Sequence, residues 1–140
     1  ECYCETNARF INILIYLFFN NFNIVSYKQF KENFKINFEK EVENSLLKAG
    51  LIISKIKNIK SYKEDSNVFD YYVITAALLY NFNNYIQFIN YDFNFKKTQE
   101  NINNFTNLII NSFNYNFFKA IECVGYTRSK SLKMTITNIF

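Results

Sequence analysis

The chain has 140 residues, of which 49% are hydrophobic and 20% aromatic, with no proline, no histidine and only two glycines. This composition excludes a disordered chain and predicts a packed, aromatic-rich core. The net charge of +4 is modest and the chain has only two arginines, so we expect no nucleic-acid partner. The excess of Asn, Ile, Lys, Phe and Tyr indicates an AT-rich genome, which makes composition a weak guide to function.

The first residues suggest an exported protein. Because the chain begins at Glu1 and not at Met, we expect an upstream segment, such as a signal peptide, to be removed. Residues 1–9 are expected to be a flexible or tethering segment. The apolar run 13–19 is too short to cross a bilayer, which takes about 20 apolar residues. We interpret residues 10–18, rich in Ile, Leu and Tyr, as the first strand.

The pattern of apolar residues changes to helical spacing after Tyr27, which predicts an amphipathic helix that ends near Ala49. Ser26 is the expected N-cap, and Gly50 is expected to end the helix in a left-handed conformation. The expected buried stripe consists of Phe34, Phe38, Val42, Leu46 and Ala49, and the expected outer face of Lys35, Glu39, Lys40 and Glu43. Two of the outer carboxylates lie one turn apart, and we interpret them as a solvated face rather than as a catalytic pair.

Four further strands are predicted after this helix. Residues 51–59 carry β-branched side chains interspersed with lysines, as in an edge strand, and residues 70–82 are apolar enough for a central strand. Residues 89–96 alternate strictly between apolar and polar side chains, which is the clearest strand signal in the chain. Residues 105–117 are expected to pair antiparallel with them. Polar turns are expected at 60–67, 83–84 and 97–104.

The last expected element is a helix capped by Thr127 or Ser129, with Leu132, Ile136 and Ile139 or Phe140 at helical intervals. The predicted order is therefore β-α-β-β-β-β-α. It predicts one α+β domain over residues 1–140, a mainly antiparallel sheet with two helices packed on one face.

Few residues suit catalysis. Without histidine the usual general base is missing, and two glycines cannot form a phosphate-binding loop. Three cysteines without histidine are too few for a zinc site. We therefore predict no enzyme activity, no metal, no cofactor and no small-molecule substrate. Cys2 and Cys4 are candidates for lipidation or for a disulfide to Cys123, and three free thiols are the alternative. Arg128 is the charged residue most suited to binding a carboxylate or phosphate of a partner, or to bonding backbone carbonyls within the fold.

Two stretches resemble a family of small Gram-negative envelope lipoproteins, whose architecture is that of the lipopolysaccharide-assembly lipoprotein. Residues 37–51, with Ala49-Gly50-Leu51 at their end, are similar to the helix of those proteins and its exit into a strand. Residues 120–128, with Gly125 and Arg128, are similar to their closing loop. The family's lipidated cysteine is the first mature residue, whereas Glu1 precedes Cys2 here. The resemblance implies a periplasmic protein anchored to the outer membrane that acts by binding partners.

The functional hypothesis follows from that resemblance. We predict an exported structural or assembly component of the cell envelope, in a secretion or transport apparatus, that binds other envelope proteins. Its contacts are expected at a sheet edge or at the surface aromatics Tyr62, Tyr71 and Tyr85. The alternative is an intracellular protein of an AT-rich virus, parasite or organelle. It would be either a ribosomal accessory protein or a helical interaction domain that grips partner helices in a groove, with residues 70–82 and 105–117 as helices.

Overall fold

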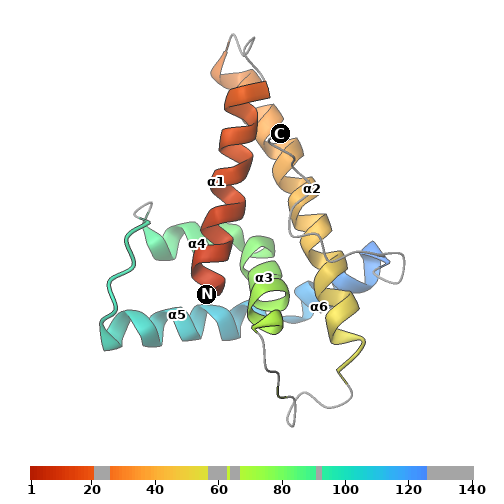
Figure 1. The fold of residues 1–140 in the computed structure, drawn as a ribbon, viewed down its shortest axis with the longest axis vertical. Coiled ribbons are helices and arrows are strands. Elements are labelled where there is room, and N and C mark those ends of the chain that lie inside the picture. Colours follow the sequence, from red (N-terminus) through yellow and green to blue (C-terminus); the bar gives the residue numbers. More distant parts are fainter. Residues whose placement is uncertain (21–25, 57–62, 64–66, 91–92, 126–140) are drawn as a thin grey trace.

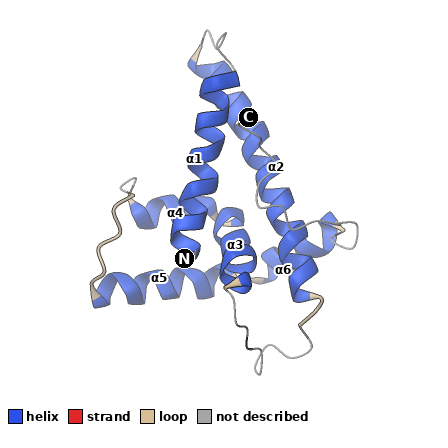
Figure 2. Ribbon diagram, viewed as in Figure 1, coloured by secondary structure: helices blue, strands red, loops and turns tan. Residues whose placement is uncertain are grey.

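The structure is a computed structural model, which describes residues 1–20, 26–56, 63, 67–90 and 93–125. Helices make up 83% of the described residues, and no strand occurs among them (Figure 2). The helices are α1 (Cys2–Asn20), α2 (Tyr27–Ile53), the π-helix η2 (Phe69–Ile74), α3 (Thr75–Tyr80), α4 (Phe82–Ile89), α5 (Gln99–Ser112) and α6 (Tyr115–Val124). The predicted α+β fold with an antiparallel sheet is therefore wrong, and the described part of the chain is all-α.

The two longest helices form the frame of the molecule. The C-terminal end of α1 lies beside the N-terminal end of α2, and the two helices diverge from there (Figure 1). At the open end η2 and α3 pack against both helices. Five consecutive residues of α3 are buried, as expected for a helix enclosed by others: Thr75, Ala76, Ala77, Leu78 and Leu79. α4 and α5 contact one side of α3, and α6 packs against α2.

α1 forms where we predicted a loose segment and a strand. Besides Asn7, five buried side chains follow one another at intervals of three or four residues, which places them on a single helical face: Cys2, Thr6, Arg9, Ile13 and Leu17. Two of these five are polar, so an apolar pattern alone does not reveal the face. Residues 2–9 are thus the packed first half of a helix, and residues 10–18 are not a strand.

α2 confirms the predicted amphipathic helix and its start. The Ser26 hydroxyl accepts a hydrogen bond from the Gln29 backbone N–H at 3.2 Å, as an N-cap does. Its predicted end is wrong, because Gly50 is a buried residue inside the helix, which runs on to Ile53. The last turns of α2 pack against η2 and α3, and this burial outweighs the weak helix propensity of one glycine.

Three more predicted strands are helical where the structure describes them. Residues 51–53 finish α2, residues 70–80 form η2 and α3, and residues 105–112 belong to α5. An apolar run buried on all sides has no period that separates strand from helix, which is the physical reason for the error. The helices that the alternative hypothesis required in the second and third of these segments are confirmed.

The strictly alternating segment is also not a strand where the structure describes it, at residues 89–90 and 93–96. Ile89 ends α4, and residues 93–96 are irregular chain whose aromatic side chains pack on helices, with Phe95 against Tyr3 at a centroid distance of 5.1 Å. Alternation favours a strand only when a neighbouring strand can pair with it, and none is present among the described residues.

Two of the predicted turns are also wrong. Residues 83–84 lie in α4, and most of 97–104 lies in α5, whose N-cap is Thr98. The loop predicted at 60–67 falls largely outside the described residues, and the helix predicted after Thr127 falls wholly outside them.

Two apolar clusters hold the helices together. One joins α2, η2, α3 and α6 through Leu46, Ala49, Ile52, Val73, Ala76, Ala77, Phe117 and Ile121. The other joins the start of α1 to α3 and α4 through Cys2, Leu78, Tyr85 and Ile89, and Phe105, Leu108 and Ile109 of α5 pack against it. α3 contributes to both clusters, so it is the element around which the other helices are arranged.

Candidate functional site

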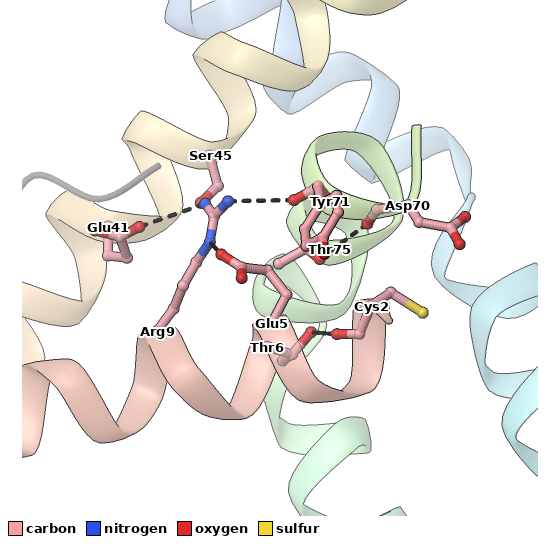
Figure 3. Close-up of polar contacts among 9 residues, drawn as sticks. All are labelled: Cys2, Glu5, Thr6, Arg9, Glu41, Ser45, Asp70, Tyr71 and Thr75. Carbon is pink, nitrogen blue, oxygen red and sulfur yellow. Dashed lines mark hydrogen bonds and ion pairs between the residues drawn. The ribbon is translucent and has the colours of Figure 1, made fainter. Parts of the chain in front are cut away.

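A buried ionic cluster lies where α1, α2 and η2 meet (Figure 3). Its centre is Arg9, whose side chain extends from α1 into the space between the other two elements and is 2% exposed. Glu41 and Ser45 reach it from successive turns of α2. A guanidinium is charged at all physiological pH values, so this position carries a permanent positive charge inside the protein.

Arg9 donates four hydrogen bonds. Its Nε bonds Glu5 Oε1 at 2.8 Å, and its Nη1 bonds Ser45 Oγ at 2.8 Å and Glu41 Oε1 at 3.4 Å. Its Nη2 bonds the backbone carbonyl of Tyr71 at 3.2 Å. One side chain therefore ties α1 to α2 and to η2, three elements that are far apart in the sequence.

The charges of the cluster balance one another. Glu41 is fully buried, and Glu5 is 13% exposed in its side chain, so two carboxylates face the guanidinium. Lys48, one turn beyond Ser45, is buried as well. Its pKa is lowered below the ordinary value, mainly by desolvation and to a smaller extent by repulsion from Arg9. Two acidic and two basic side chains thus share a small volume, which is the condition under which buried charges are tolerated.

The π-helical turn supplies the backbone acceptor. Within η2 the Thr75 backbone N–H reaches back to the Asp70 carbonyl, and the Thr75 hydroxyl donates to the same oxygen at 3.0 Å. A π-turn displaces carbonyls from the α-helical ladder, and such turns often mark special sites. Here the displaced register places the Tyr71 carbonyl within reach of Arg9.

The chemistry open to this cluster is structural. Its hydroxyl, on Ser45, accepts from Arg9, and the carboxylates on either side of the guanidinium are engaged in ion pairs. All of the groups are at most slightly exposed. The cluster fixes how α1, α2 and η2 are placed, and so it fixes the shape of the surface between α1 and α2.

That surface is an aromatic groove, made by the rings of Phe10, Phe30, Phe34, Phe38, Phe82 and Phe93. On α2 the successive rings of Phe30, Phe34 and Phe38 stack at centroid distances of 6.4 and 5.7 Å, because residues four apart lie on one helical face. Phe10 of α1 lies 5.7 Å from Phe34, and Phe82 of α4 lies 4.6 Å from Phe38.

The groove consists of three adjoining hollows that share Phe34. One, of about 540 Å³, lies between α1 and the start of α2, and includes Leu14 and Tyr27. The second, of about 530 Å³, is lined by Phe10, Phe82 and Phe93. The third, of about 780 Å³, extends along α2 to Leu46. Most of the groove rings are half-buried, so a large aromatic surface borders solvent.

Charged side chains border the groove unevenly. Lys31, Glu32 and Lys35 line the hollow near the start of α2, and Lys35, Glu39 and Glu43 line the hollow at its other end, so the two linings differ in the sign of their net charge. Lys35 and Glu39 form an exposed ion pair with a 3.8 Å separation, which contributes little energy. Taken along α2, the rim is basic toward the N-terminal end of the helix and acidic toward Leu46.

The predicted cysteine chemistry is not assembled in the structure. All three thiols are free, so neither Cys2 nor Cys4 is bonded to Cys123. Cys2 is buried, and burial raises its pKa above the ordinary thiol value, whereas Cys4 and Cys123 are exposed. A lipid on Cys2 would have to displace packed side chains, which leaves Cys4 as the accessible thiol in α1.

The predicted surface aromatics are only partly placed. Tyr85 is fully buried, and its hydroxyl donates to Asn7 Oδ1 at 2.7 Å, so its assignment to a binding surface is wrong. Tyr71 is half-buried in η2, and the negative charge of Glu1 raises its pKa. Tyr62 and Arg128 lie outside the described residues.

Part of the groove, but little of the ionic cluster, could be predicted from the sequence. The α2 stripe through Phe34 and Phe38 was predicted, although as core rather than as the floor of a groove. α2 also carries a polar stripe, which we did not predict. It consists of Glu41, Ser45 and the buried Lys48, which lie at helical spacing. Nothing in the sequence indicates that Arg9 would meet this stripe from another helix.

Comparisons with known proteins give no family: no family model, no curated protein and no solved structure matches the chain. None of the helices described is long and apolar enough to span a membrane, and the described residues contain no group of three or more acidic or cysteine side chains placed to hold a metal ion.

Proposed function

We propose that this chain is a non-enzymatic, helical protein-interaction domain whose aromatic groove binds the apolar face of an amphipathic helix from a partner protein. The observation that carries the proposal is the row of stacked, half-exposed phenylalanine rings along α2, bordered by α1 and α4. Aromatic side chains are enriched in protein interfaces and supply most of the energy of many hot spots.

The shape of the groove favours a helix as its occupant. The ring row and the lining that continues it to Leu46 extend over 16 residue steps of α2 from Phe30, or about 24 Å at 1.5 Å per residue. Side chains spaced four apart form a ridge along α2, and helices pack by setting such ridges into the grooves of a partner helix. A partner with apolar residues at intervals of three and four would fill the three hollows in turn.

The rim charges favour one orientation of that helix. A helix carries partial positive charge at its N-terminus and partial negative charge at its C-terminus. Glu39 and Glu43 would attract the first, and Lys31 and Lys35 the second. The partner helix is therefore expected to lie antiparallel to α2.

The envelope hypothesis depended on a resemblance to proteins with a different fold. That resemblance included a helix that exits into a strand after Leu51, and the described residues contain no strand. Export, lipidation and a periplasmic location stay predictions from the sequence, as does an intracellular location, and the interaction proposal requires none of them.

The test is a selection from a displayed library of helices about 18 residues long, close to the length of the ring row, with randomised apolar stripes. Affinities of selected peptides are then measured by fluorescence anisotropy for the wild type, Phe34→Asp and Ile36→Asp. Ile36 is the matched control, because it is 50% exposed on α2 but lines none of the three hollows. Losing a central aromatic anchor costs about 2 kcal/mol or more, so Phe34→Asp should weaken binding by about 30-fold, and Ile36→Asp should leave it unchanged.

Two outcomes would overturn the proposal. One is a selection that yields no apolar-stripe peptide, or peptides whose binding tolerates Phe34→Asp. The other is co-sedimentation of the chain with vesicles of phosphatidylcholine and phosphatidylserine that Phe34→Asp abolishes, since the groove would then serve a membrane. Circular dichroism at 222 nm confirms that each variant keeps its helices.

A further inference from the structure

We propose that residues 126–140 of this chain occupy the aromatic groove in cis and thereby compete with the partner helix. This inference rests on the proposed function and adds its regulation. The structure does not describe residues 126–140, so only the sequence of this segment is used. The position and lining of the groove come from the described residues.

The first observation is where the described chain stops. Val124, the last residue of α6, lines the same hollow as Leu46, Glu39 and Glu43, at the acidic end of the groove. Gly125 follows with φ +67°, a left-handed conformation that ends the helix. The described chain therefore ends beside the groove, since Val124 is the residue before Gly125.

The second observation is charge complementarity. The segment has three basic residues and no acidic one, and the basic residues belong to its first half: Arg128, Lys130 and Lys133. Those residues are the closest in sequence to Val124, which lines the same hollow as the exposed side chains of Glu39 and Glu43. Opposite charges placed at one end set the direction in which the segment enters the groove.

The third observation is pattern and length. Leu132, Ile136 and Ile139 recur at helical intervals, and residues 134–140 have no charged side chain to oppose burial. Fifteen residues span about 22 Å as a helix and about 50 Å when extended, so the segment can follow the 24 Å ring row in either form. Its apolar half would then lie over the Phe34 and Phe30 end of the groove.

Tethering makes even weak docking effective. A short tether gives an effective concentration of about 1 mM, so a segment with an intrinsic Kd of about 100 µM would occupy the groove about nine-tenths of the time. A partner helix competing for the same rings would then bind about tenfold more weakly than it binds the open groove.

The test uses the full chain and needs no partner for its first measurement. Because the chain has no tryptophan, Phe34→Trp introduces a single fluorescent reporter in the centre of the groove. Leu132→Asp with Ile136→Asp is expected to shift its emission to the red and to increase iodide quenching. Thr137→Asp with Asn138→Asp adds the same charge on the opposite face of a helix and should change neither.

The second measurement is the affinity for a library-selected helix, which should increase about tenfold in Leu132→Asp/Ile136→Asp and stay constant in the control. Reporter emission and quenching equal in all variants would overturn cis docking, even if the helix still binds. A reporter that responds in a chain that binds no helix would instead support docking while the proposed function fails. If Phe34→Trp loses helix by circular dichroism, Phe10→Trp reports on the same groove.

Discussion

Replacing Arg9 by methionine tests whether the buried ionic cluster holds the fold together. Methionine keeps much of the length of the side chain and removes all four hydrogen bonds that Arg9 donates. Glu41, which is fully buried, then loses its guanidinium partner, and the Tyr71 carbonyl loses its donor. The substitution therefore leaves polar groups in the interior without these bonds.

The expected loss of unfolding free energy is about 3–5 kcal/mol, the usual cost of removing one partner from a buried ion pair. That is a large share of the total stability of a domain, which is about 5–15 kcal/mol. With a urea dependence of about 1.5 kcal/mol per molar, the unfolding midpoint should fall by about 2–3 M. Far-ultraviolet circular dichroism follows the transition, because the described fold is helical.

Two comparisons make the Arg9 prediction specific. Lys35→Met breaks the exposed pair with Glu39 and should hardly move the midpoint, since both side chains are more than half exposed. Glu41→Gln in the Arg9→Met background removes the buried charge, so the double variant should lose less than the sum of the two single losses. Strict additivity, or an Arg9→Met midpoint no lower than that of Lys35→Met, would refute this account of the cluster.

Three further predictions concern single residues. Burial raises the pKa of Tyr85, so the folded state keeps a proton that the unfolded state releases above pH 10, and stability should fall there. Tyr85→Phe should reduce the fall of the unfolding free energy with pH above pH 10 by up to about 1.4 kcal/mol per pH unit, as measured by urea titrations. An unchanged pH dependence would contradict this prediction. Maleimide should modify Cys4 and Cys123 before Cys2, as peptide mass mapping would detect, because Cys2 is buried with a raised pKa; equal rates would argue against that burial. Gly125→Ala should cost about 1 kcal/mol from backbone strain alone, since nothing lies within 4 Å of an added Cβ, and a neutral effect in denaturation would show that the strain is absent.

α2 shows how much the sequence could predict of local structure. The Ser26 cap and the helical spacing of Phe34, Phe38 and Leu46 are local signals, and the structure confirms the cap and the helix. Of the three side chains only Leu46 is buried in the core. The end at Gly50 was wrong because packing on η2 and α3 decides whether one glycine ends a helix, and that packing involves residues more than twenty positions away.

The alternating segment at residues 89–96 shows the opposite limit. Its pattern satisfied the rule for a half-buried strand, and its aromatic and β-branched residues strengthened the likeness to β structure. A strand is stabilised by its neighbours, so no pattern within eight residues can establish one. Phe93 and Phe95 pack on helices instead.

The same division separates the two parts of the candidate site. The chain's own sequence determined that helix α2 would present a row of phenylalanine rings, since residues four apart share a helical face whatever surrounds them. Only the tertiary structure decided that Phe10 and Phe82 would border this row and make it a groove, and that Arg9 would meet Glu41, 32 positions away in the chain. Those contacts depend on how whole helices pack, because burial free energy is shared among distant residues and leaves no periodic trace in any one segment.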